Sequence, residues 1–232
     1  MTLPPLSSLP PSSVPSFRGR FITFEGCDGS GKTTQWQQAV TWLQQRFPER
    51  TIVATRNPGG TPLGQAIRQL ILTPRPSDEA PMNSMTELLL YMADRAQHVA
   101  ELVRPHLEAG AIVLCDRFID SSVAYQGVAR GLPFETIAML NKLVCGEVWP
   151  HATLLYDAPV EVLAERRALR DGHTPQDRME KEGLTFHRQV REGFLQLARA
   201  EPERFHCLDA SLPLNEVHQH TQQVLLKLIP SA

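Results

Sequence analysis

The residues with the clearest chemical potential form a glycine-rich stretch, G-x-x-x-x-G-K-T, at residues 26–33. An apolar run, residues 21–24, precedes it, and residues 34–47 follow with apolar side chains at helical spacing. Glycines let backbone N–H groups approach phosphate oxygens, and the positive end of the following helix attracts an anion. Lys32 can reach the β- and γ-phosphates, and Thr33 offers a hydroxyl to Mg²⁺. The pattern predicts a nucleoside-triphosphate site made of Gly26, Cys27, Asp28, Gly29, Ser30, Gly31, Lys32, Thr33 and Thr34.

A second candidate is the pair Asp116 and Arg117, which follows the apolar residues 111–115. An acid at the end of a buried strand beside a phosphate loop can hold Mg²⁺ or its water. The alternative is a turn or helix-cap residue. Arg117 follows directly and could donate two hydrogen bonds to a phosphate. We therefore favour the interpretation of Asp116 as a metal ligand, together with Thr33.

Two other groups of residues are less specific. Tyr91 and Arg95 lie four residues apart, so an aromatic face and a guanidinium would share one helix face. Together they could stack on a base and donate to the O4 atom of thymine or uracil, where cytosine carries an amine. Spacing alone favours the simpler interpretation, with Tyr91 in the core and Arg95 in solvent.

Four arginines, at positions 166, 167, 170 and 178, surround the polar segment 171–183. Charged runs are usually solvated faces. A mobile arginine-bearing segment can also exclude water and neutralise a transferring phosphoryl group. Spacing leaves both interpretations open.

Alternating strands and helices must position these residues. We expect strands at 21–24, 51–55, 111–115, 153–156 and 205–208, and helices at 34–47, 63–72, 84–110, 120–129, 133–146, 160–170, 184–200 and 213–228. Ser84 and Glu87 match a capping box at the start of the long helix. Apolar strands separated by helices predict an α/β fold of the P-loop NTPase kind, a parallel sheet covered by helices on both faces, with a mobile lid at about 166–183. Ligands of such sheets lie beyond the carboxyl ends of the strands, which brings residues 26–33, 56–61, 116–117 and 157 to one edge.

Composition limits the other function classes. The 232 residues, 42% of them hydrophobic, suit one domain at residues 17–232, preceded by a proline- and serine-rich tail at residues 1–16 that we expect to be disordered. A net charge of −2 offers no basic surface for nucleic acid. Four cysteines without a C-x-x-C pair indicate a reduced, cytoplasmic protein. No apolar run approaches the roughly 20 residues of a membrane span.

Seven sequence blocks, taken in order, resemble the bacterial thymidylate kinase family over residues 20 to about 228. They are G-C-D-G-S-G-K-T-T at 26–34, R-N-P-G-G-T at 56–61, A-D-R-A-Q-H at 93–98, D-R-F at 116–118, A-Y-Q-G at 124–127, D-R-M-E at 177–180, and P-E-R-F at 202–205 with Asp209-Ala210. The resemblance implies Mg²⁺-dependent phosphorylation of dTMP to dTDP by ATP, in dTTP synthesis, by a cytoplasmic homodimer.

The resemblance also implies residue roles. Catalysis would fall to Lys32, Arg117 and Arg170, and dTMP would be bound by Asp28, Arg56, Tyr91, Arg95, Arg117, Ser122, Tyr125 and Gln126. Gly29 stands where eukaryotic-type enzymes place an arginine, so the lid arginine Arg170 should act instead, with a much smaller role for Arg167. Two positions depart from the family pattern: Asn57 replaces the usual Glu, and His151 replaces a common Asp.

Three alternatives remain at this stage. One is a kinase for another monophosphate, such as dUMP, dCMP or a purine nucleotide. Another is a GTPase-like switch, although residues 141–144, N-K-L-V, lack the acid of N-K-x-D. The third is a non-catalytic ATP-binding module, against which Lys32, Asp116 and Arg117 argue.

Overall fold

The computed structural model describes residues 17–76, 79–171 and 176–229, so the tail predicted at residues 1–16 lies outside the described residues. A five-stranded sheet with the order β2-β3-β1-β4-β5 runs through the centre, and every neighbouring pair of strands is parallel. The strands are β1 (Arg20–Glu25), β2 (Ile52–Arg56), β3 (Ile112–Asp116), β4 (Ala152–Asp157) and β5 (Phe205–Asp209). The apolar strand pattern therefore predicted the sheet correctly.

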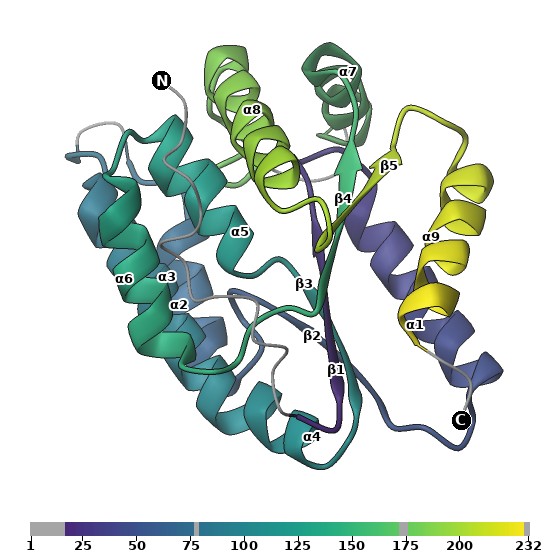
Figure 1. Ribbon diagram of the computed structural model, residues 1–232. Coiled ribbons are helices and arrows are strands. Elements are labelled where there is room, and N and C mark those ends of the chain that lie inside the picture. The colour runs from purple at the N-terminus through teal and green to yellow at the C-terminus, as the bar shows by residue number, and fades with distance from the viewer. Residues whose placement is uncertain (1–16, 77–78, 172–175, 230–232) are drawn as a thin grey trace.

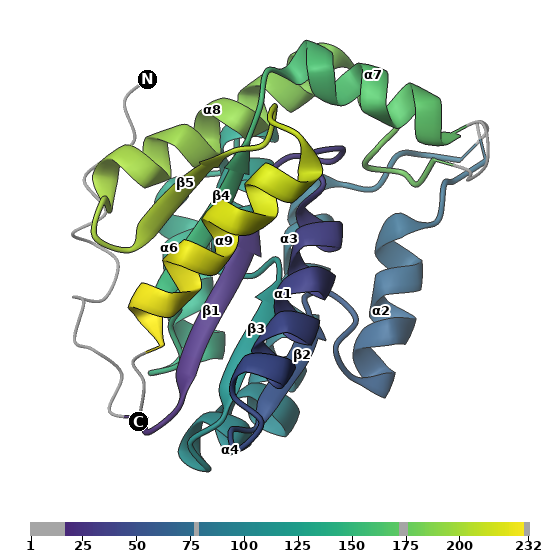
Figure 2. The ribbon, with the colours of Figure 1, turned by 90° about the vertical axis from the view of Figure 1, so that its right-hand side faces the viewer.

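Helices cover both faces of the sheet (Figure 1). One face carries α1 (Lys32–Arg46) and α9 (Leu214–Leu228), and the other carries α3 (Ser84–His98), α6 (Phe134–Cys145) and α8 (Leu184–Ala200). The helix α2 (Pro62–Leu72) packs against α3. Figure 2 shows α7 (Val160–Asp171) lying above the end of the sheet toward which the strands point. That end is the one at which the sequence predicted the site.

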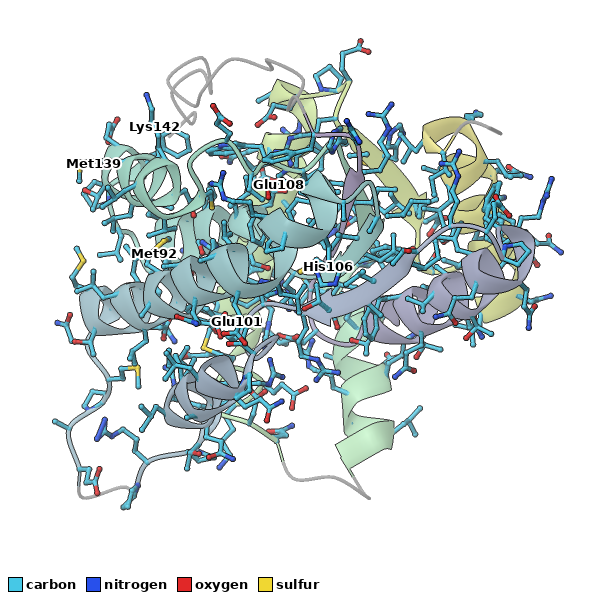
Figure 3. The ribbon with its side chains drawn as sticks, turned by 90° about the horizontal axis from the view of Figure 1, so that it is seen from below. Met92, Glu101, His106, Glu108, Met139 and Lys142 are labelled. Atoms are coloured by element: carbon cyan, nitrogen blue, oxygen red, sulfur yellow. The ribbon has the colours of Figure 1, made fainter. Side chains whose placement is uncertain are left out.

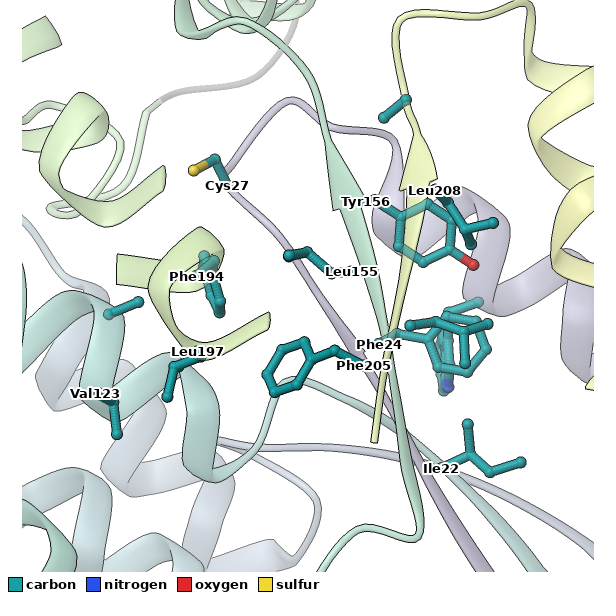
Figure 4. Packing of buried hydrophobic residues seen from close by; sticks show 14 of the residues in the cluster. Ile22, Phe24, Cys27, Val123, Leu155, Tyr156, Phe194, Leu197, Phe205 and Leu208 are labelled. Atoms are coloured by element: carbon teal, nitrogen blue, oxygen red, sulfur yellow. The ribbon is translucent and has the colours of Figure 1, made fainter. Parts of the chain in front are cut away.

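The core follows the two-residue period of the strands. On the side of α1 and α9, the rings of Phe24 and Tyr156 stack with their centroids 5.9 Å apart (Figure 4). On the opposite side, Phe21 of β1 packs edge-on against Phe118, with the centroids 4.9 Å apart. Phe118 follows Arg117, so this packing fixes the start of a segment that enters the site.

The long helix expected at residues 84–110 is interrupted. A π-helical turn, η2 (Val99–Val103), separates α3 from α4 (Arg104–Glu108). A second such segment, η3 (Val123–Ala129), follows α5 (Ile119–Ser122) where one regular helix was expected. Turns of this kind are frequent at functional sites, and η3 carries Tyr125 and Gln126.

The predicted capping box at Ser84 and Glu87 is wrong. The side chain of Asn83 caps α3 instead, accepting a hydrogen bond of 2.9 Å from the backbone N–H of Met85. Glu87 is fully buried, with its carboxylate 2.6 Å from Arg178 and 3.3 Å from Arg130. Two arginines bind this carboxylate more strongly than a single backbone N–H would.

Candidate active site

The phosphate loop connects β1 to α1 and borders a cavity of about 410 Å³. All the predicted triphosphate-binding residues except Gly26 line this cavity. Gly29 has φ +88°, and a Cβ atom there would lie 2.7 Å from the carbonyl oxygen of Leu163 and 3.1 Å from Cγ of Arg167. Only glycine fits such a position, because α7 packs directly onto the loop.

Lys32, Thr33 and Asp116 meet at the edge of this cavity. Lys32, which is only 6% exposed, pairs through its ammonium group with the Asp116 carboxylate. The Thr33 hydroxyl donates to Asp116 Oδ2 at 2.8 Å. Burial tends to raise the pKa of Asp116, but Lys32 and Arg117 outweigh it and hold that pKa below its ordinary value. The paired, ionised acid and the hydroxyl supply the hard oxygen ligands that suit Mg²⁺.

Asp28 links the phosphate loop to the residues after β3. Its carboxylate accepts from Arg117 Nη2 at 2.7 Å and from the Tyr125 hydroxyl at 3.0 Å. Burial would raise the pKa of Asp28, but Arg117 and Lys32 lower it to about 2. The Arg117 guanidinium also lies over the Tyr125 ring, 5.1 Å from its centroid. Asp28 is therefore a charged acceptor already oriented at the cavity wall.

A second, smaller cavity of about 70 Å³ adjoins the first. Every predicted dTMP-binding residue except Arg56 lines this smaller cavity, namely Asp28, Tyr91, Arg95, Arg117, Ser122, Tyr125 and Gln126. Arg56 lines the larger cavity. Asp28 and Arg117 border both cavities. The structure thus brings all of the predicted dTMP residues together.

Arg95 is buried, so the interpretation that places it in solvent is wrong. Only 1% of its surface is exposed. Its Nε donates to Asn57 Oδ1 at 3.1 Å and its Nη1 to Asn141 Oδ1 at 2.6 Å. Its Nη2 donates to the Phe118 carbonyl at 3.1 Å and to Ser122 Oγ at 2.9 Å. These acceptors are all neutral, and they hold the guanidinium at the wall of the smaller cavity.

The two departures from the family pattern have different settings. Asn57 is buried between two charged groups, since its Nδ2 donates to the Asp94 carboxylate while its Oδ1 accepts from Arg95. His151 lies before β4, where its Nδ1 accepts from the Phe21 N–H at 3.0 Å. The first residue belongs to the site and the second to the sheet.

Several residues that line the cavities were not predicted as ligands, among them three charged ones on α2, on α7 and after it. Arg68 of α2 and Asp177 border both cavities, and Arg167 of α7 borders the larger one. Arg68 is the only charged residue of α2, and that lone charge was the available signal. Its Nη1 donates to the Pro58 carbonyl at 3.1 Å, so the side chain folds back toward the site.

The segment predicted as a lid is attached at both described ends. Arg167 is 6% exposed, and its Nη1 donates to the Asp28 carbonyl at 2.7 Å. Arg178 Nε donates to the Ile71 carbonyl at 2.7 Å, and its guanidinium pairs with Glu87. Arg170 lies near the end of α7, but its side chain is outside the part of the chain that the structure describes.

A phosphate loop with a paired lysine and acid, next to a second cavity that shares an arginine with it, defines a P-loop kinase acting on a nucleoside monophosphate. The family model for thymidylate kinase matches residues 24–221. The chain belongs to the thymidylate kinase family, and it phosphorylates dTMP to dTDP with ATP.

Relatives support this membership over nearly the whole chain. A thymidylate kinase of Marinomonas sp. is 47% identical over 213 residues, covering 91% of this chain and 96% of the relative. That of Pseudomonas fluorescens Pf-5 is 47% identical over 214 residues, covering 92% and 98%. The crystal structure of thymidylate kinase from Ehrlichia chaffeensis superposes with a TM-score of 0.71 at 33% identity, covering 89% and 98%. None of the helices in the described part has the length and apolar character needed to span a membrane.

Proposed function

We propose that ATP occupies the larger cavity and dTMP the smaller one, with the acceptor phosphate between them at Arg117. The observation that carries this assignment is the wall shared by the two cavities, where Asp28 and Arg117 border both. A coupled ADP-release assay with dTMP, dUMP, dCMP and purine monophosphates tests it. Preference for a cytosine or purine nucleotide would contradict the assignment of the smaller cavity.

We assign the groups at the reaction centre to positioning and charge neutralisation. The acceptor phosphate oxygen is already a nucleophile, so no general base is needed. Arg68 and Arg117 would hold the acceptor phosphate, because both border the two cavities where they meet, and Arg56 would assist from the wall of the larger one. Lys32 and Arg170 would neutralise the charge that develops on the transferring group.

We propose that the reaction uses Mg²⁺ held by Thr33 and Asp116. The hydrogen bond between these side chains places two hard oxygen ligands together at the phosphate cavity. Bound there, the ion would neutralise charge on the phosphate oxygens.

We also propose a cytoplasmic location. The four cysteines are free, which agrees with a reducing compartment, and ATP is available there.

Arg95→Ala should raise KM for dTMP far more than KM for ATP and narrow the preference for dTMP over dCMP. The guanidinium holds Ser122 and Asn57 at the wall of the base cavity, and a charge-assisted contact is worth about 1.5–3 kcal/mol. Steady-state kinetics with both monophosphates measures the change. Arg199→Ala is the control, because this exposed arginine of α8 pairs with Glu192, lines neither cavity and should leave the base preference unchanged.

We propose that two copies associate through α2, α3 and α6, which pack in succession. Each helix carries exposed apolar side chains, which are Leu63 and Leu70 on α2, Leu89 on α3, and Met139 and Leu143 on α6. Figure 3 shows Met139 at the outer edge of α6. Leu143→Glu should convert the dimer to a monomer in analytical ultracentrifugation, whereas Leu226→Glu on α9 should not. A monomeric parent protein would contradict the proposal.

A further inference from the structure

Glu25 is a buried acid with no role assigned so far. It is the last residue of β1, directly before the phosphate loop, and its side chain is fully buried. It is absent from the lining of both cavities. Any influence on substrates must therefore act through neighbouring residues.

The Glu25 carboxylate binds the turn that follows Arg117. Its Oε1 accepts from the Phe118 N–H at 2.7 Å and from the Ser121 N–H at 3.3 Å. Its Oε2 accepts from the Ser121 hydroxyl at 2.7 Å. One carboxylate thus fixes the turn that opens α5, from its N-cap residue Phe118 to Ser121.

Arg117 needs this support because its backbone is strained. Its φ of +67° is the only positive φ of a non-glycine residue in the described ranges. This left-handed conformation costs free energy, which surrounding contacts must offset. The Arg117 N–H donates to the Phe24 carbonyl at 3.0 Å, while the Glu25 side chain holds the residues that follow. The end of β1 therefore holds Arg117 from two sides.

The same carboxylate also acts on the Arg117 guanidinium. Arg117 Nη1 donates to Ser121 Oγ at 3.2 Å and lies 3.9 Å from Glu25 Oε2. Arg117 Nη2 donates to Asp28. The guanidinium consequently lies between Asp28 on the phosphate loop and Glu25 at the end of β1.

We propose that Glu25 is a positioning residue for Arg117, which it holds in the left-handed conformation that directs the guanidinium to the acceptor phosphate. This inference rests on the proposed binding of the dTMP phosphate by Arg117. Glu25 can play this role only while its carboxylate is ionised, because only that form accepts all three hydrogen bonds and attracts the guanidinium.

The electrostatic surroundings make the effect depend on pH. Burial raises the pKa of Glu25, Asp120 of α5 raises it further, and Arg117 opposes both, which leaves it at about 7. Arg95 of α3 and Cys115 of β3 also interact with this carboxyl. The ionised fraction therefore grows as the pH rises through about 7, and the support for Arg117 grows with it.

Glu25→Gln tests the proposal with little change of shape. The amide can still accept from the backbone and donate to Ser121, but it carries no charge. At pH 8 we expect KM for dTMP to rise about tenfold, equivalent to a loss of about 1.4 kcal/mol, with KM for ATP nearly unchanged. The ratio of wild-type to variant kcat/KM for dTMP should fall toward one at about pH 6, and this ratio cancels the ionisation of the substrates.

Glu161→Gln is the matched control, since it makes the same change in a carboxylate of α7 that pairs with Arg188 and lines neither cavity. It should leave KM for dTMP and the pH profile unchanged. An unchanged KM in Glu25→Gln, or a ratio that stays constant with pH, overturns the inference.

Two further variants separate the possible failures. If Arg117→Ala leaves KM for dTMP unchanged, the proposed phosphate site is wrong; if Arg117→Ala raises it while Glu25→Gln does not, only the role of Glu25 is wrong. Should Glu25→Gln not fold, Glu25→Asp is the second variant. It keeps the charge, but its shorter side chain moves the carboxylate away from Phe118 and Ser121. It should raise KM for dTMP without affecting ATP, and an unchanged KM in the folded Asp variant would equally overturn the inference.

Discussion

Lys32→Ala should lower kcat by at least about 100-fold while the protein remains folded, because removal of one preorganised charge donor at a reaction centre typically costs that much. The Lys32 side chain lines the phosphate cavity and pairs with Asp116. Its removal also takes away the strongest charge that lowers the pKa of Asp116. Single-turnover kinetics with saturating ATP and dTMP, together with circular dichroism, measures the effect.

Lys227→Ala provides the control for this change. Lys227 is an exposed residue of α9, away from the proposed dimer surface, so its loss should alter neither kcat nor the melting temperature. A folded Lys32→Ala protein with nearly normal kcat would refute the assignment of the phosphate loop.

Arg170→Ala should lower kcat and kcat/KM together by about 100-fold or more, with little change in dTMP affinity. Arginines that neutralise a transferring phosphoryl group contribute roughly 10³-fold or more in related enzymes. Charge develops on the equatorial oxygens only during transfer, so the loss should appear in the transition state rather than in binding.

Arg167→Ala is the natural comparison. Arg167 packs over Gly29 and donates to the Asp28 carbonyl, so we expect a looser phosphate loop, a higher KM for ATP and a lower melting temperature. Steady-state kinetics on both variants decides between them. A larger loss of kcat at Arg167 than at Arg170 would transfer the catalytic role to the arginine that lines the cavity.

The sequence predicted the parts of the site that depend on local pattern. The phosphate loop is specified by its glycines and flanks, and Asp116 by its place at the end of an apolar strand. The base site depends instead on packing between distant segments. The hydrogen-bond partners of Arg95 come from the loop after β2, from α5 and from α6, and spacing within α3 cannot reveal them. Arg68 escaped prediction for the same reason, because tertiary packing alone brings it to the cavities.

Arg95 is fully hydrogen-bonded before any nucleotide arrives. The unfavourable step of removing a guanidinium from water is therefore completed when the chain folds and adds nothing to the free energy of binding dTMP. The desolvation of Arg95 instead lowers the free energy of unfolding, since no carboxylate in the described residues forms an ion pair with this guanidinium. Selection for heat resistance and selection for base discrimination would thus act on this position in opposite directions.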